Sequence, residues 1–124
     1  MSVAVSISLD PSSGSGLCLE DDGCYWFLYH YLERASQQTG RMVDPYGDAA
    51  FSPIHLDALL TALEATATDA ERWTEDRAVR VGWRGTQEVF DKVSKQRLTD
   101  LIGEFIYLVE MAKLPGAKII CIGN

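Results

Sequence analysis

The chain has 124 residues and a hydrophobic fraction of 47%, which predicts one folded domain over residues 1–124 whose core needs no metal ion or disulfide bond. Its 18 acidic and 11 basic residues give a net charge of −7, which disfavours binding to nucleic acid or to an anionic membrane. The same charge would attract a basic protein partner, although acidity is also common in domains where it only maintains solubility.

The N-terminal part predicts a strand, a loop and a helix. Residues 2–9 alternate apolar and polar side chains, as in a strand that has one buried face and lies near an edge of the sheet. A loop rich in Gly, Ser and Pro follows at 10–16. Asp21 and Asp22 then favour the start of a helix that ends before Gly40.

This helix carries a second stripe of large side chains beside its apolar face. Tyr25 and Tyr29 lie four residues apart, and so do Trp26 and His30. Side chains at this spacing share one side of a helix. Either the helix is buried on both sides, or the aromatic residues form an exposed patch for a partner.

The middle of the chain predicts a turn and a leucine-rich helix. The sequence Asp-Pro-Tyr-Gly at 44–47 has the residue types of a type I turn. Ser52 is predicted as the N-cap of the following helix, and Pro53 as its first residue. Phe51 and Leu56 have the positions of a hydrophobic staple.

The length of this second helix is open. Leu56 begins a buried face that continues with Leu59, Leu60 and Leu63. A capping box that begins at Thr68 predicts a restart of the helix, which would then extend to about Asp76. One bent helix and two separate helices are both compatible with this pattern.

The last third of the chain predicts a strand at 78–84, a long helix and a closing strand. Residues 87–93 fit either the second strand of a hairpin or a helix. Ser94 is the predicted cap of the long helix, which Pro115 and Gly116 end. The apolar run 118–122 predicts an interior strand covered on both faces. The fold class is therefore α+β: a small single domain of three to four strands, mainly antiparallel, packed with three main helices that could all lie on one face.

No cofactor or metal site is predicted. Asp44 and Asp48 have the spacing of calcium ligands, but Ala49 stands where the calcium loop requires glycine. His30 and His55 are too isolated to form a zinc site with the cysteines. No nucleophile elbow, phosphate loop or dinucleotide motif occurs, so we do not expect an enzyme.

The cysteines favour a reducing compartment. Cys18, Cys24 and Cys121 are odd in number and have no CxxC spacing, so we expect free thiols in a cytoplasmic protein. Cys24 and Cys121 are predicted to be buried and inert. The sequence has no apolar run long enough to cross a membrane, and its first residues do not resemble a secretory signal.

The segment 44–51 resembles a group of small bacterial proteins that share the pattern DPYGD-x-x-F before a leucine-rich helix. The matching residues are Asp44, Pro45, Tyr46, Gly47, Asp48 and Phe51, followed by Leu59 and Leu60. In its small size, its acidity and its lack of catalytic residues the chain resembles bacterial toxin-immunity proteins. This resemblance implies a protein that binds a cognate effector and blocks it.

Three functional hypotheses follow. The first is a non-catalytic, immunity-type inhibitor that occludes the active site of a basic toxin or effector. The second is a small-molecule enzyme or sensor with a pocket near His30, His55 and Asp48, and the third is a homo-oligomer, such as a homodimer, that buries the aromatic stripe. For the first hypothesis the predicted partner-binding residues are Asp44, Tyr46, Asp48, Tyr25, Trp26 and Trp83.

Overall fold

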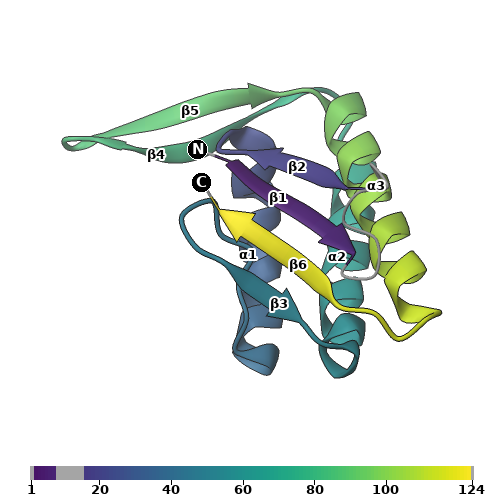
Figure 1. Ribbon diagram of the computed structural model, residues 1–124. Coiled ribbons are helices and arrows are strands. Elements are labelled where there is room, and N and C mark those ends of the chain that lie inside the picture. The colour runs from purple at the N-terminus through teal and green to yellow at the C-terminus, as the bar shows by residue number, and fades with distance from the viewer. Residues whose placement is uncertain (1, 8–15, 124) are drawn as a thin grey trace.

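The computed structural model describes residues 2–7 and 16–123 (Figure 1). Leu9 and most of the loop expected at 10–16 therefore lie outside the described residues. Within the described residues the chain forms three α-helices, six strands and one short 3₁₀-helix. In chain order they are β1 (Ser2–Ile7), β2 (Leu17–Glu20), α1 (Gly23–Thr39), β3 (Ala49–Phe51), η1 (Pro53–His55), α2 (Leu56–Glu71), β4 (Arg77–Arg84), β5 (Gln87–Val93), α3 (Lys95–Lys113) and β6 (Ile119–Gly123).

Four of the strands form one antiparallel sheet, and the helices lie on one of its faces (Figure 1). The strand order is β2-β1-β6-β3, so the predicted α+β class is confirmed. The prediction of three to four strands is wrong because the short strands β2 and β3 were not recognised. The prediction that β1 lies nearer an edge than the closing strand is also wrong, because β2 pairs with its outer side, with Val3 opposite Leu19, and β1 and β6 are both interior strands.

The closing strand β6 lies in the interior of the sheet, between β1 and β3. The apolar run 118–122 predicted that both faces of this strand are covered, and this prediction is wrong. Ile119 and Cys121 are buried, whereas Ile122 is 51% exposed. Because all three helices cover the same face of the sheet, no helix among the described residues lies over the opposite face of β6 (Figure 1).

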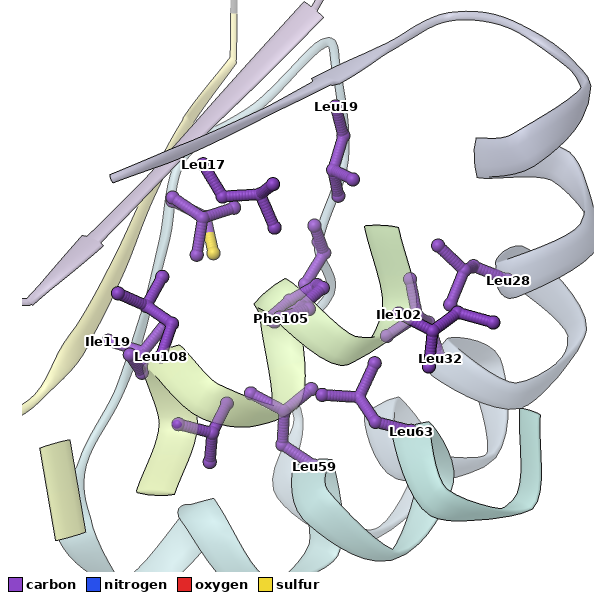
Figure 2. Close-up of a cluster of buried hydrophobic side chains, with 14 of the residues drawn as sticks. Leu17, Leu19, Leu28, Leu32, Leu59, Leu63, Ile102, Phe105, Leu108 and Ile119 are labelled. Atoms are coloured by element: carbon purple, nitrogen blue, oxygen red, sulfur yellow. The ribbon is translucent and has the colours of Figure 1, made fainter. Parts of the chain in front are cut away.

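The core lies between the inner face of the sheet and the three helices. Figure 2 shows buried side chains from β2, α1, α2, α3 and β6 converging in one cluster. The labelled members are Leu17, Leu19, Leu28, Leu32, Leu59, Leu63, Ile102, Phe105, Leu108 and Ile119. Burial of these side chains is the main favourable contribution to folding.

The predicted ends of α1 and the predicted start of α3 are confirmed. The Asp22 carboxylate accepts hydrogen bonds from the backbone N–H groups of Cys24 and Tyr25, at 3.0 and 3.3 Å. Gly40 ends α1 with a φ of 71°, a conformation that glycine adopts without strain. Ser94 accepts a hydrogen bond from the Arg97 N–H at 3.3 Å, as an N-cap does.

Helix α2 is one helix that ends at Glu71, so the predicted restart through Asp76 is wrong. The Thr68 hydroxyl donates to the Glu64 carbonyl within the helix instead of capping a new one. Ser52 precedes the short helix η1 as predicted, but its side chain makes no capping hydrogen bond. The buried face of α2 continues without a break past Thr66, since Thr66 is itself fully buried.

Residues 87–93 form a strand, which resolves the open alternative. Strands β4 and β5 make a two-stranded antiparallel hairpin that is separate from the main sheet and projects beyond it (Figure 1). Gly85, with a φ of 64°, occupies the first central position of the connecting turn, as in a type II′ turn. A register shift between Arg80 and Gly82 marks a β-bulge in β4.

The hairpin is attached to the start of α1 through a close backbone contact. The Gly23 N–H donates to the Asp91 carboxylate of β5 at 2.9 Å. A Cβ atom at position 23 would lie 2.4 Å from the Val93 side chain, so only glycine fits there without a shift. The hairpin and α1 can therefore approach each other because position 23 has no side chain.

We predict that Gly23→Ala lowers the free energy of unfolding by about 1–3 kcal/mol, because it overpacks this junction. Urea unfolding followed by circular dichroism measures the change. The matched control is Gly103→Ala in α3, where an added Cβ meets nothing within 4 Å. There the substitution should stabilise the protein by about 0.5–1 kcal/mol. Equal stability of the two variants would contradict the proposed junction.

The buried thiols predict a loss of stability at alkaline pH. Burial raises the pKa of Cys121 to about 12 from an ordinary value of 9.0. Burial, reinforced by the Asp22 carboxylate, raises the pKa of Cys24 to about 11. Unfolding therefore releases protons above pH 9, and the free energy of unfolding should fall as the pH rises from 9 towards 11. Urea unfolding at several pH values tests this, and Cys121→Ala should show a shallower fall.

Candidate functional site

An open pocket of about 450 Å³ lies between α1 and the projecting hairpin. One wall of the pocket is the aromatic stripe of α1, and the other wall is formed by the two strands of the hairpin. Its lining residues are Trp26, Tyr29, His30, Val79, Arg80, Val81, Gly82, Trp83, Glu88 and Phe90. Predominantly apolar and aromatic walls with a few charged groups are typical of binding sites in proteins.

The α1 wall is built from packed aromatic rings. The rings of Trp26 and Tyr29 lie 5.2 Å apart between centroids, and Tyr29 meets His30 edge-on at 6.1 Å. Trp26 and Tyr29 are half-buried and His30 is exposed. The sequence left open whether this stripe is buried or forms an exposed patch, and each alternative holds for part of it. Tyr25 is buried in the core, and the other three side chains line the pocket.

Tyr25 is therefore a core residue and does not belong to the accessible surface. It is 3% exposed, and its hydroxyl donates to the Val43 carbonyl at 2.7 Å. Burial raises its pKa, and the nearby Asp44 carboxylate adds to the shift. The prediction that Tyr25 contacts a partner does not agree with this position, because its ring is buried and packs edge-on against Trp26 at 5.3 Å.

The hairpin wall brings two exposed aromatic side chains into the pocket. Trp83 is 58% exposed and Phe90 is 54% exposed. The Arg80 guanidinium lies over the Trp83 ring, 5.3 Å from its centroid, and 3.7 Å from the Glu88 carboxylate. An exposed cation–π contact of this kind contributes about 0.5–1 kcal/mol.

The β-bulge in β4 is what places these side chains together. Arg80 is paired with Phe90, and Trp83 with Glu88. Directly paired residues of an antiparallel hairpin share a face, and so do residues two apart, such as Glu88 and Phe90. Without a bulge, positions 80 and 83 would face opposite sides. The extra residue at Val81 shifts the alternation, so that Arg80 and Trp83 share the face of Phe90.

The predicted turn at 44–47 is present and stands beside this pocket. The Gly47 N–H donates to the Asp44 carbonyl at 3.3 Å, and the Tyr46 N–H donates to the Asp44 carboxylate at 2.9 Å. Tyr46 is 60% exposed. Its hydroxyl donates to the Asp21 carboxylate at 2.7 Å.

Asp21 joins the turn to the pocket. Its second carboxylate oxygen accepts a hydrogen bond from the Trp26 indole N–H at 2.8 Å. Asp21 thus holds Tyr46 on one side and Trp26 on the other. The sequence indicated only that the negative charge of Asp21 favours the start of the helix. Nothing in the sequence indicated that position 46 would lie beside it.

Asp48 supports the backbone of the last strand. Its carboxylate accepts a hydrogen bond from the Gly123 N–H at 3.0 Å, and the same N–H lies 3.2 Å from the Gly47 carbonyl. A Cβ atom at position 123 would lie 2.6 Å from the Gly47 nitrogen, so this close approach requires glycine. Asp44 and Asp48 also line a second pocket, of about 390 Å³, together with Arg41.

The predicted site residues are therefore brought together in part. Asp44, Tyr46 and Asp48 lie in and after the turn, and Trp26 and Trp83 line the same pocket. Asp21, Tyr29, Arg80 and Phe90 were not predicted as site residues. Only Tyr29 had a sequence signal, its place in the aromatic stripe.

Neither of these two pockets holds all the polar groups expected for a small-molecule site. His30 lines the pocket beside the hairpin, and Asp48 lines the second pocket. His55 lies in η1 and lines neither of them. Its Nδ1 atom is buried and has no hydrogen-bond partner among the described residues.

The described residues contain no group of three or more His, Cys, Asp or Glu side chains placed to hold a metal ion. Cys24 and Cys121 are buried free thiols, and Cys18 is exposed. Over the described ranges, no helix has the length and apolar character needed to cross a membrane. Comparison with protein-family models, curated proteins and solved structures found no match, so the site is interpreted from its own geometry.

The Asp21 bridge makes a prediction for Tyr46. The hydrogen bond to Asp21 raises the pKa of the Tyr46 hydroxyl, because the bond favours its protonated form. We predict that Asp21→Ala lowers this pKa towards the ordinary tyrosine value of about 10. Titration of the Tyr46 ring carbons by NMR measures it, and the Trp26 indole N–H signal should shift in the same variant. Asp100→Ala in α3 is the control, and an unchanged Tyr46 pKa in Asp21→Ala would contradict the bridge.

Proposed function

We propose that this chain is a non-catalytic protein-binding module of the immunity type, which neutralises a basic bacterial effector by covering its active site. One observation carries the proposal. Hydrogen bonds join Tyr46 of the turn to Asp21 and Asp21 to Trp26, and Trp26 lines one pocket with Trp83 of the hairpin, so that aromatic and acidic side chains follow one another from the turn to the hairpin.

The aromatic part of this surface has the properties of a binding hot spot. Trp, Tyr and Arg are enriched among the residues that contribute most to protein interfaces. Here Trp83, Phe90 and Tyr46 are more than half exposed. Trp26 and Tyr29 are held by ring packing, so little side-chain entropy would be lost on binding.

The charge pattern supports a partner with a basic surface. The whole chain has a net charge of −7, and Asp21, Asp44 and Asp48 lie on the turn side of the aromatic pocket. These charges would speed the encounter with a basic effector and make its rate fall with ionic strength.

The hairpin has the opposite charge. Residues 77–93 carry four basic and two acidic side chains, a net charge of +2. The favoured partner therefore presents a basic region to the turn and an acidic or apolar region to the hairpin. This arrangement would specify the orientation of the complex, because a reversed partner would meet like charges.

A non-catalytic, cytoplasmic role fits the described chemistry. The raised pKa values of Cys24 and Cys121 keep these thiols protonated at neutral pH, when a thiolate would be needed for nucleophilic attack. The free cysteines favour a reducing compartment. The resemblance of the chain to bacterial toxin-immunity proteins in size, acidity and lack of catalytic residues supports the same proposal.

A second candidate function is binding of a small aromatic molecule in the α1–hairpin pocket. The observation that favours it is the pocket itself, with His30, Arg80 and Glu88 as polar groups among aromatic walls. Titration with indole, followed through the NMR signals of Trp26 and His30, tests it. Saturable shifts that are lost in Trp83→Ala would support this function, and unchanged spectra would exclude indole-like ligands.

The inhibitor proposal predicts that the chain neutralises the effector encoded beside its own gene. Co-expression should restore growth, and the purified proteins should form a stoichiometric complex. We predict that Trp83→Ala weakens this complex at least tenfold, because a truncated hot-spot residue costs about 2 kcal/mol or more. Calorimetric titration measures the affinity.

The matched control is Tyr107→Ala, which removes another exposed aromatic side chain from α3, outside the proposed surface. It should bind the effector as the unaltered chain does. If the unaltered chain neither restores growth nor binds the effector, the inhibitor proposal is wrong. If Tyr107→Ala weakens the complex and Trp83→Ala does not, the binding surface lies elsewhere.

A further inference from the structure

Strand β5 has a long, regular and unpaired edge. In the part of the chain that the structure describes, β5 pairs with β4 alone, over the whole of its length. Figure 1 shows β5 on the outer side of the projecting hairpin, with β4 towards the body of the protein. An isolated two-stranded hairpin has limited stability in water, and an unpaired edge is a template for another strand.

The two edges of the hairpin differ in how they would accept another strand. Strand β4 carries Arg77, Arg80 and Arg84 and is interrupted by the bulge. Charged side chains and bulges both hinder edge pairing. Strand β5 has no bulge of its own, and the charges of Gln87–Val93 are of mixed sign, one Lys and two carboxylates, so they can pair with opposite charges on a second strand.

The sequence of β5 is complementary to itself. When two copies of β5 are placed antiparallel with Phe90 opposite Phe90, Glu88 of each copy stands opposite Lys92 of the other. Glu88, Phe90 and Lys92 lie two residues apart and so share one face of the strand. Opposite charges and aromatic pairs at directly opposed positions each contribute about 0.2–1 kcal/mol.

Neighbouring registers lack this complementarity. Centring the pair on Asp91 would place the two Asp91 carboxylates opposite each other, and centring it on Val89 would place Glu88 opposite Phe90. The charges of β5 therefore favour one pairing register over these two alternatives. An edge that bound strands of any sequence would not need such a preference.

We propose that the partner of the β5 edge is a second copy of this chain. Two β5 strands pair antiparallel about a two-fold axis at Phe90, and the two hairpins form one four-stranded sheet in the order β4-β5-β5-β4. Each charge pair occurs twice because of the symmetry. The contact covers part of the exposed Phe90 ring and leaves the main sheet and α3 free.

This dimer does not rest on the proposed inhibitor function, although its contact shares Glu88 and Phe90 with the pocket. The effector surface also uses Trp26, Trp83 and the turn at 44–48, and Lys92 does not line the pocket. Effector binding that persists in Lys92→Glu while the dimer is lost, or a dimer that persists without any effector, separates the two proposals.

A charge-swap experiment tests the proposal, with the molecular mass measured by sedimentation equilibrium over a range of concentrations. The unaltered chain should change from monomer to dimer as its concentration rises. In a dimer of Glu88→Lys, the new lysine of each copy stands opposite Lys92 of the other copy. In a dimer of Lys92→Glu, the new glutamate of each copy stands opposite Glu88 of the other copy. Each variant alone should dimerise at least about tenfold more weakly.

The two variants mixed together should form a heterodimer as strong as the original homodimer, because every opposed pair again has opposite charges. The double variant with both substitutions should also recover homodimerisation. Recovery in the mixture shows that each variant is folded. Glu104→Lys, an exposed reversal of charge on α3, is the control and should dimerise normally.

Three results would overturn the proposal. A chain that stays monomeric at all accessible concentrations has no such interface. Single variants that dimerise as well as the unaltered chain do so through another surface. A mixture that stays monomeric, while each folded variant has lost its dimer, shows that the charges do not face each other across the β5 edge.

Discussion

The start of α1, at residues 21–23, joins four parts of the molecule, and the candidate surface depends on it. Asp22 caps the helix and also accepts a hydrogen bond from Arg97 of α3 at 2.8 Å. Gly23 donates to Asp91 of the hairpin, and Asp21 binds both the exposed turn and the first aromatic residue of the pocket. Because these bonds come from adjacent residues, the orientation of α1 determines where the hairpin and the turn stand relative to each other.

The hairpin is the element on which both proposals depend. It is not part of the main sheet, so its position follows from its contact with α1 and from the glycine at 23 that permits this contact. One face, shaped by the bulge, presents Trp83 and Phe90 towards the pocket. Its outer edge is a different kind of surface, since strand pairing uses the backbone of β5, although Glu88 and Phe90 take part in both. One small element can therefore serve two interactions.

The physical origin of the errors in the fold is the same in each case. Strands β2 and β3 are too short to show a periodic pattern of their own, and they form because β1 and β6 offer them edges. The apolar run of β6 indicated a buried strand correctly, but the sequence does not reveal that all helices lie on one face. At Thr68 a capping signal was present, yet continuous burial of the α2 face, Thr66 included, outweighed it. A local sequence pattern predicts the wrong structure where tertiary contacts contribute more free energy than the local interactions do.

The sequence by itself determined the three helices with most of their caps, the turn at 44–47 and the α+β class. These depend on interactions between residues close together in the chain, whose geometry is set by backbone and side-chain stereochemistry. Only the tertiary structure decided that Tyr25 is a core residue while Trp26 lines a pocket, because both lie on the same helix and differ only in what packs against them. It also decided that Asp21 meets Tyr46, a contact between residues far apart in sequence that forms when the folded core brings their segments together.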